Sequence, residues 1–457
     1  MQNNYTKSQN KMSPAIVLPA TSIIALAFTF SQSINASTAD LSSLSDTSDL
    51  SSLSSLDTTS ECVTFDSEVR MITTNCETAN LTQIDSQIKN PDAIRKDTNV
   101  DRGWILNAGI TVAENATLYI NSSDTSWLKI IADGETAHPI LVIGGLKIDS
   151  AKITSWNPNT NNYTSSEDSH RNGEDVQIGT PRPYIVIDDE ATGTTDITNS
   201  EIAHLGYESG YGGGRTGLRY EGGDGSVIRG NNMHDLYFGF YSKEVGGMTI
   251  ENNHIHDNIQ YGLDPHTGTH DMIIRNNTIH GSGSSGVICS LDCYNITLEN
   301  NKIYNNTKNG IMFSRNMFDS VARNNIVNNE DNGIVISESH NNEVYNNIIS
   351  DSGSGIDVDE DSFENLVYNN TIIDISEPSE ALHLRDGASE QNTLHSNTLI
   401  GINGQRISLD ELEITEGAED SSENNNGSSG DEEDGNTDNG NDSGDGESES
   451  DNNNDSK

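Results

Sequence analysis

Residues 261–266, which read YGLDPH, place a phenol, a carboxylate and an imidazole within six positions. Histidine exchanges protons near neutral pH because its reference pKa is about 6.5, so His266 could act as a general base. Asp264 could orient the imidazole, and Tyr261 could return a proton from the opposite side of a substrate. The three residue types therefore indicate proton-transfer chemistry, provided that the backbone holds them on one surface.

The backbone that carries these residues is predicted by a repeat. Asparagine pairs recur at 231/232, 252/253, 276/277, 300/301, 324/325, 346/347 and 369/370, in steps of 21 to 24 residues. A glycine followed by an apolar residue recurs in step, at 239, 262, 286, 310, 333 and 355. A period of this length indicates a solenoid with one turn per repeat, and the leucine scaffold of leucine-rich repeats is absent. The sequence predicts an all-β fold, a parallel β-helix with about three short strands per turn and asparagines stacked at the corners.

The repeat also predicts which side chains face outward, because side chains alternate between the two faces of a strand. Positions one and three past each glycine are mostly apolar and should face the core, so positions two and four past it should face out. Equivalent positions on adjacent turns lie about 4.8 Å apart. Lys243 should therefore lie beside His266, and Tyr241 beside Asp264. Pro265 lacks the backbone N–H that a stacked strand needs for its hydrogen bonds, and such an exception commonly marks a functional or strained place.

Composition narrows the possible partners. The 457 residues include 71 acidic and 24 basic ones, for a formal charge of −47. Such an acidic chain is a poor ligand for nucleic acid or an anionic membrane, and an acidic substrate would need a local patch of positive charge. Only 32% of the residues are hydrophobic, which is thin for a thick core but sufficient for the narrow core of a solenoid.

The chain is predicted to comprise five segments: a signal peptide (1–36), a Ser/Leu-rich spacer (37–60), an N-terminal cap with the first β-helix turns (61–195), a catalytic β-helix region (196–415) and a disordered acidic tail (416–457). We therefore expect a secreted, periplasmic or cell-surface protein without a membrane anchor once the signal is removed. The spacing of the four cysteines allows two local disulfides, Cys62–Cys76 and Cys289–Cys293, although the second pair could equally be buried thiols.

The YGLDPH stretch resembles the Tyr-Gly-x-Asp-Pro-His signature of the mannuronan C-5 epimerases. These are right-handed parallel β-helix enzymes that convert β-D-mannuronate to α-L-guluronate within alginate. The resemblance extends to AHLGY at 203–207, LYFGFYSKE at 236–244 and DNIQYGLDPH at 257–266, which resemble the periplasmic bacterial branch. It covers roughly residues 195–375. It implies that Tyr261, Asp264 and His266 are catalytic, that the partner is an anionic uronate polysaccharide, and that no cofactor is required.

Epimerisation at C5 also needs a group that neutralises the uronate carboxylate, because only then is the C5 hydrogen acidic enough to remove. The bacterial branch has an arginine at the place aligned with Leu291, and a leucine cannot bind a carboxylate. Lys243, Lys308 and Arg315 could substitute, and the two lysines are favoured. Tyr241 completes the predicted substrate-binding set. This departure from the family leaves the identity of the uronate polymer open.

Other functions remain possible from the sequence. A uronate polysaccharide lyase removes the same proton and then expels the 4-linked sugar. A glycoside hydrolase is less well supported, because it needs two carboxylates about 5–10 Å apart, and only Asp357 and Asp359 join Asp264 in the outward columns. A non-catalytic carbohydrate- or metal-binding β-helix is the third alternative. His254 and His256 share one strand face, and the aspartates of residues 357–361 make calcium a possible ligand.

Overall fold

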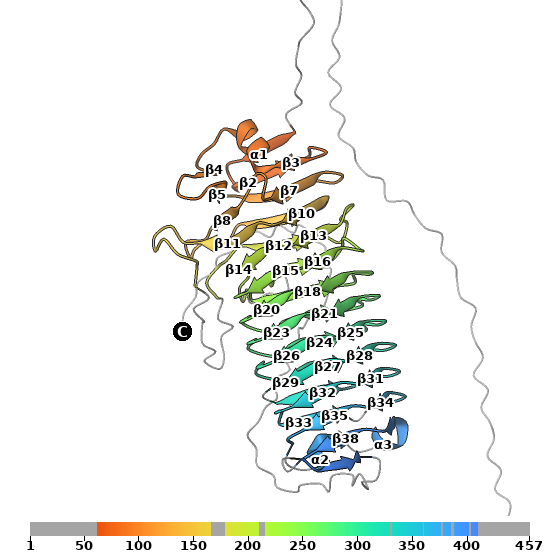
Figure 1. Ribbon diagram of the computed structural model, residues 1–457. Helices are drawn as coiled ribbons and strands as arrows, with labels where there is room; N and C mark the ends of the chain where they lie inside the picture. The colour runs from red at the N-terminus through yellow and green to blue at the C-terminus, as the bar shows by residue number, and fades with distance from the viewer. Residues whose placement is uncertain are drawn as a thin grey trace, which may run out of the picture. The chain divides into compact units, whose positions relative to one another are not determined.

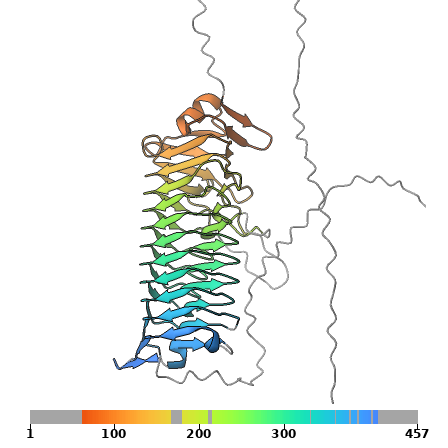
Figure 2. The same cartoon turned by 90° about the vertical axis from the view of Figure 1, so that its right-hand side faces the viewer.

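The computed structural model describes residues 62–165, 179–209, 215–329, 331–359, 361–375, 378–384, 388–401 and 404–409. Across these ranges short strands stack turn upon turn into a solenoid, so the predicted parallel β-helix is confirmed (Figures 1 and 2). The predicted signal peptide, the spacer and the acidic tail from 416 lie outside the described residues. Among the residues that the structure covers, no helix combines the length and apolarity needed to cross a membrane.

Three sheets, here named A, B and C, form the walls of the solenoid. Sheet A contains β1 (Val63–Asp66), β2 (Met71–Thr74), β6 (Gly109–Val112), β9 (Pro139–Val142), β12 (Tyr184–Ile187), β15 (Gly217–Tyr220), β18 (Phe238–Lys243), β21 (Asp264–His266), β24 (Val287–Ser290), β27 (Ile311–Ser314), β30 (Asn332–Ile336), β33 (Ser354–Val358) and β36 (Leu382–Leu384). Sheet B contains β3 (Ala79–Asn80), β7 (Thr117–Asn121), β10 (Gly145–Asp149), β13 (Thr195–Thr198), β16 (Val227–Arg229), β19 (Thr249–Glu251), β22 (Ile273–Arg275), β25 (Thr297–Glu299), β28 (Val321–Arg323), β31 (Glu343–Tyr345), β34 (Leu366–Tyr368) and β37 (Thr393–His395).

Sheet C contains β4 (Ile94–Asp97), β5 (Gly103–Leu106), β8 (Trp127–Ile131), β11 (Lys152–Trp156), β14 (Glu201–Ala203), β17 (Asn232–His234), β20 (His254–His256), β23 (Thr278–His280), β26 (Lys302–Tyr304), β29 (Ile326–Asn328), β32 (Ile348–Ser350), β35 (Thr371–Ile373), β38 (Thr398–Ile400) and β39 (Arg406–Ser408). The described helices are α1 (Leu81–Ile88), α2 (Pro378–Ala381) and α3 (Ala388–Gln391). Pairing is parallel along the body, and antiparallel pairs occur at the ends, as between β4 and β5 or β38 and β39.

The core is narrow and its pattern follows the glycine columns. Residues one and three past each glycine, such as Phe240 and Cys289, are fully buried, as predicted. The glycines themselves are needed where turns approach closely: a Cβ on Gly239 would lie 2.2 Å from the carbonyl oxygen of Gly262. The Cys62–Cys76 disulfide is present, whereas Cys289 and Cys293 are buried free thiols. The second predicted bridge therefore does not form.

Asparagines form the predicted internal ladder at one corner of the solenoid. The Asn277 side-chain oxygen accepts hydrogen bonds from the backbone N–H and the side-chain amide of Asn253, both at 3.0 Å. Its own amide donates to the Ile250 carbonyl at 2.9 Å and to Asn301 at 3.1 Å. Each asparagine thus satisfies the backbone of the preceding turn, which is what buried polar groups require.

We predict that Asn277→Ala lowers the free energy of unfolding by about 1–3 kcal/mol for each buried group left without a partner. The comparison is the urea midpoint of the variant against that of the wild type. Asn328→Ala is the matched control, because the Asn328 amide bonds to Asp351 at the exposed surface. Equal midpoints for the two variants would contradict a stabilising role of the ladder.

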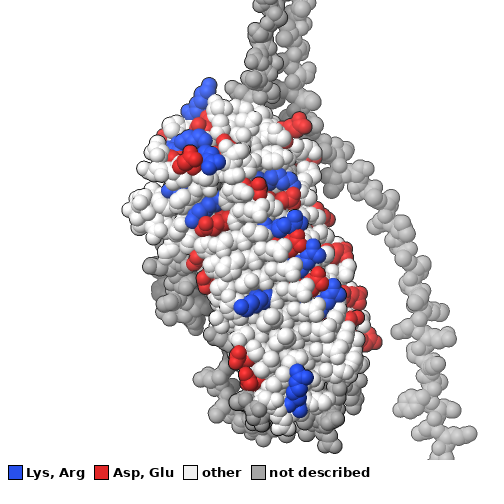
Figure 3. Space-filling model, in the orientation of Figure 1, with Lys and Arg blue, Asp and Glu red and all other residues white. Residues whose placement is uncertain are grey.

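Charged side chains on sheet B neutralise one another. Glu251 bonds to Arg229 on the preceding turn and to Arg275 on the following one, and Arg323 pairs with Glu299 at 2.7 Å. Figure 3 shows basic and acidic groups alternating down the turns on that side of the molecule. The arginines of this sheet are therefore already paired with carboxylates, and sheet A is the better place for a cationic site.

Candidate functional site

The predicted neighbours lie side by side on the outer face of sheet A. In the pairing of β18 with β21, Tyr241 is in register with Asp264 and Lys243 with His266, so both predicted pairs are confirmed. The same columns continue to Arg219 on the preceding turn and to Ser290 on the following one. Regular stacking thus brings residues far apart in the sequence onto one wall.

The imidazole of His266 has polar neighbours at both ring nitrogens and is only 7% exposed. The Thr267 hydroxyl lies 2.6 Å from Nδ1, and the Tyr241 hydroxyl lies 3.5 Å from the same nitrogen. At the other end of the ring, Arg315 Nη2 lies 3.3 Å from Nε2 and also donates to the Ser290 hydroxyl at 3.0 Å. Because a guanidinium can only donate, this arrangement favours the tautomer that carries its proton on Nδ1 and its lone pair on Nε2.

Burial and positive neighbours keep His266 neutral. Desolvation is the largest cause, and the charges of Arg315, Arg219 and Lys243 add to it, lowering the pKa of His266 to about 4. At neutral pH the ring is therefore unprotonated and can accept a proton. An anionic ligand beside these cations would weaken their repulsion and raise the pKa of His266, strengthening the base when substrate is present.

Arg219 is a site residue that the sequence analysis missed. Its Nη2 pairs with Glu221, its guanidinium carbon lies 4.7 Å from the centre of the Tyr241 ring, and the side chain is largely buried. Its Nε and Nη1 have no hydrogen-bond partner among the described residues. Buried donors of this kind are costly, and an anion would satisfy them. Gly217 could have revealed this residue, because Arg219 lies two positions after that glycine and therefore belongs to the same outward column as Tyr241.

The remaining predicted residues have different positions. Asp264 is 3% exposed beside Tyr241, and Tyr261 lies just before β21 with its ring edge-on to Phe238 at 5.1 Å. Lys243 is half-buried beside His266. Lys308 is exposed and precedes β27, whereas Arg315 follows it. Since His266 stands at the C-terminal end of β21, the structure brings Lys243 and Arg315 to it. Lys308 and the backbone of Tyr261 each stand three residues before a strand, at the opposite end.

Among the described residues, neither of the two predicted metal-binding stretches gathers three ligands. Asp357 is buried on sheet A and lies 3.3 Å from Nδ1 of His383. The rings of His254 and His256 lie 4.3 Å apart on β20, as their alternation predicts. Within the described part of the chain, three close acidic, histidine or cysteine ligands occur at His204, His234 and Asp235, outside both stretches.

These features define a parallel β-helix protein whose outer wall holds a buried, unprotonated histidine among cations. Residues 191–381 match the family model NosD, described as periplasmic copper-binding protein. A mannuronan C5-epimerase of Pseudomonas fluorescens is 29% identical in an alignment of 144 residues, and the match covers 28% of this chain and 24% of that protein. Over this stretch the chain is similar to that mannuronan C5-epimerase, and it spans about a quarter of the length of the curated protein it matches.

Solved structures agree on the fold. The crystal structure of the periplasmic alginate epimerase AlgG superposes with a TM-score of 0.60 at 19% identity, covering 72% of this chain and 85% of that one. A point mutant of the same epimerase gives a TM-score of 0.61 with the same identity and coverage. This likeness establishes the parallel β-solenoid architecture along most of the described chain.

Proposed function

We propose that this protein is a polysaccharide-modifying enzyme that epimerises uronate residues at C5, converting mannuronate to guluronate in an alginate-like polymer. The observation that carries the proposal is the neutral His266 with its Nε2 beside Arg315. The base and the carboxylate-binding cation must lie close together, because the hydrogen to be removed and the carboxylate are both attached to C5. The relationship to a mannuronan C5-epimerase supports this choice of reaction.

In the proposed reaction, the substrate carboxylate binds to Arg315 and to the unpartnered N–H groups of Arg219. His266 Nε2 removes the C5 proton, and negative charge moves onto the carboxylate, where the arginines stabilise it. A tyrosine, with Tyr261 as the candidate, returns a proton to the opposite face of the ring. One proton leaves and one arrives, so the product differs from the substrate only in configuration. Asp264 and Tyr241 position the reacting groups.

The proposed substrate is an anionic polysaccharide, and the proposed place of action lies outside the cytoplasm. Three cations gather around His266 in a protein whose formal charge is −47, which meets the need for a local positive patch. The Cys62–Cys76 disulfide supports an oxidising compartment. We propose no cofactor for the reaction, because Arg315 and Arg219 supply the positive charge that a metal ion would otherwise provide.

Incubation with polymannuronate in deuterated water, followed by NMR, tests the proposal. The expected result is deuterium at C5 together with guluronate signals. The lyase alternative shares the proton removal but then breaks the glycosidic bond. Unsaturated ends that absorb ultraviolet light would therefore assign the protein as a lyase and contradict the epimerase. Absence of both deuterium and new ends would overturn the catalytic proposal in favour of a binding protein.

The pH dependence of the reaction should follow His266. Because the pKa of His266 is lowered to about 4, the imidazole is unprotonated and able to accept a proton above that pH. We expect kcat/KM to stay constant from neutral pH to about one unit above this pKa, and to fall as the pH drops through it. In Arg315→Gln the fall should begin at higher pH, because losing a neighbouring cation raises the pKa of His266. An acid limb that does not move in this variant would contradict the assignment.

A further inference from the structure

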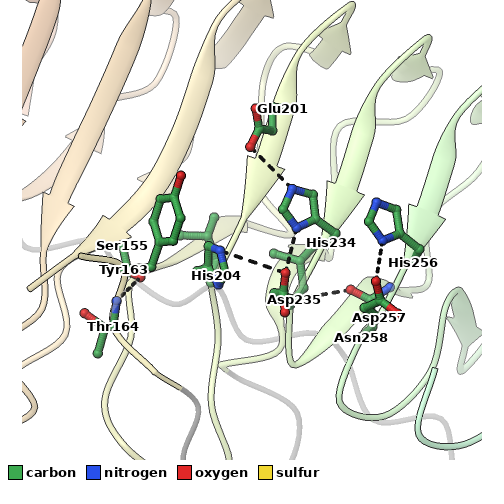
Figure 4. A network of polar contacts seen from close by, with 12 residues as sticks. Ser155, Tyr163, Thr164, Glu201, His204, His234, Asp235, His256, Asp257 and Asn258 are labelled. Carbon is green, nitrogen blue, oxygen red and sulfur yellow. Dashed lines mark hydrogen bonds and ion pairs between the residues drawn. The ribbon is translucent and has the colours of Figure 1, made fainter. Parts of the chain in front are cut away.

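A second cluster of functional side chains lies where sheet C turns towards sheet A. His204 follows β14, and Asp235 follows β17 one turn further on; both occupy the left-handed region, with φ of 57° and 53°. His234, the last residue of β17, is in register with Ala203. Figure 4 shows the two imidazoles and the carboxylate converging from these two turns. None of the three takes part in the proposed epimerisation.

The donor atoms of this cluster are close enough to share an ion. His234 Nδ1 lies 2.7 Å and His204 Nε2 lies 3.9 Å from Asp235 Oδ2, and the three ligand atoms all lie within 4.8 Å of one another. Ligands about 2.0–2.1 Å from a tetrahedral zinc ion lie about 3.3 Å from each other. Small side-chain adjustments would therefore bring all three atoms onto one ion.

The surroundings of His234 resemble those of a metal-binding histidine. Such a histidine commonly donates its second ring N–H to a carboxylate, which fixes the orientation of the ring. Here Nε2 lies 3.3 Å from Glu201 Oε1, and Lys152 holds the same carboxylate oxygen at 2.7 Å. The His204 ring is held as well, stacked on Tyr163 at 4.2 Å. The cluster thus has the outer support that a metal site needs.

The backbone beneath the cluster is also fixed. The buried guanidinium of Arg182 donates to the carbonyls of Gly206 and Asp235, at 2.6 Å and 2.9 Å. Its Nη2 donates to the Leu205 carbonyl at 3.2 Å. One side chain therefore joins the corner that follows His204 to the corner that holds Asp235, and keeps the ligands at a set spacing.

The next turn contains half of the same arrangement. His256 and Asp257 repeat the His234–Asp235 pair with the same 2.7 Å contact. However, Nε2 of His256 meets the side-chain oxygen of Asn232 at 3.0 Å instead of a carboxylate. The His256–Asp257 pair is not part of a three-ligand group among the described residues. His256 therefore supplies a matched control within the same protein.

We propose that His204, His234 and Asp235 bind one divalent transition-metal ion of the zinc class. Two imidazoles and one carboxylate suit zinc, copper(II) or nickel(II) better than calcium, which prefers oxygen ligands. The fourth position is left for water. The ion would tie two successive turns together at the start of the segment that leads into β18, the strand of Tyr241 and Lys243. It would act as a structural clamp, and its binding does not depend on the proposed epimerase activity.

The proposal is tested with the full-length chain, without an affinity tag, after treatment with a chelator. Titration with zinc chloride in a calorimeter should show one strong site per chain and raise the thermal midpoint. His204→Gln and Asp235→Asn should lose that site, and Glu201→Gln should weaken it about 10–100-fold. His256→Gln should bind as the wild type does, and circular dichroism should show that each variant is folded. With copper(II), electron paramagnetic resonance should report two nitrogen ligands.

Two results would overturn this proposal. The first is zinc binding by the wild type no stronger than that of the His204→Gln variant, because the cluster would then be a network of hydrogen bonds only. The second is strong binding that survives His204→Gln but disappears in His254→Gln. That outcome would place the ion at the exposed His254–His280 pair, whose Nε2 atoms lie 2.8 Å apart.

Discussion

Replacing His266 with glutamine should slow exchange of the C5 hydrogen by about 10²–10⁴-fold, the usual contribution of a positioned general base. The glutamine amide is of similar size and can still meet Arg315 or Thr267, but it cannot accept a proton near neutral pH. Binding of the polymer should change little, because the cations around the site remain. The loss should therefore appear in kcat, and KM should stay close to that of the wild type.

The measurement is the rate of deuterium incorporation into polymannuronate, with bound polymer determined separately. His256→Gln is the matched control, since His256 lies on sheet C and its two ring nitrogens contact Asp257 and Asn232. It should retain the wild-type rate. Exchange at the wild-type rate in His266→Gln would show that His266 is not the base, even if the protein proved to be an epimerase.

Arg315→Gln should cost about 10²–10³-fold in kcat, which is typical when one donor to a developing negative charge is removed. The charge on the carboxylate grows as the C5 proton leaves, so the arginine acts more strongly on the transition state than on the bound polymer. Arg315→Lys should recover part of the rate. A lysine restores the charge, but it cannot reach Ser290 and the carboxylate with two fixed N–H groups at once.

The Arg219→Gln variant distinguishes the role of Arg219 from that of Arg315. Arg219 presents unpartnered N–H groups, whereas Arg315 is the arginine beside His266 Nε2, so loss of Arg219 should weaken polymer binding more than it lowers kcat. Because the charge of Arg219 also lowers the pKa of His266, the acid limb of the pH profile should move to higher pH, as in Arg315→Gln. Lys302→Gln, an exposed change on sheet C, controls for the general loss of one positive charge. If Arg315→Gln behaves like Lys302→Gln, Arg315 is not the neutralising group.

The sequence predicted the parts of the site that depend on the repeat. A period with little variation fixes the register of a stacked strand, and this is why Lys243 can be placed beside His266 from the sequence alone. The repeat also predicted which columns are buried, including that of Cys289. The Cys289–Cys293 bridge was left open because spacing alone allows it. In the structure the Cys293 thiol instead donates to the carbonyls of Ser290 and Pro265, at 3.1 Å and 3.6 Å.

Side chains that reach across turns could not be predicted in this way. Arg315 stands two strands away from His266, and only the length and direction of its side chain bring Nη2 to the imidazole. Lys308 precedes the same strand that Arg315 follows. Residue type and spacing alone do not show which of the two ends lies near His266. Arg219 was missed because the glycine before it, Gly217, lies outside the run of glycines from Gly239 that revealed the period.

The groups around His266 come from successive strands of one sheet, from β15 with Arg219 to β27, which leads into Arg315. Adding one whole coil between β24 and β27 would preserve the fold and its core, yet move Arg315 about 4.8 Å away from the imidazole. Lengthening the molecule beyond either end of this block would leave the distances inside it unchanged. Relatives can therefore differ in overall length by gaining or losing coils at their ends, while the strands of this block must keep their number and order.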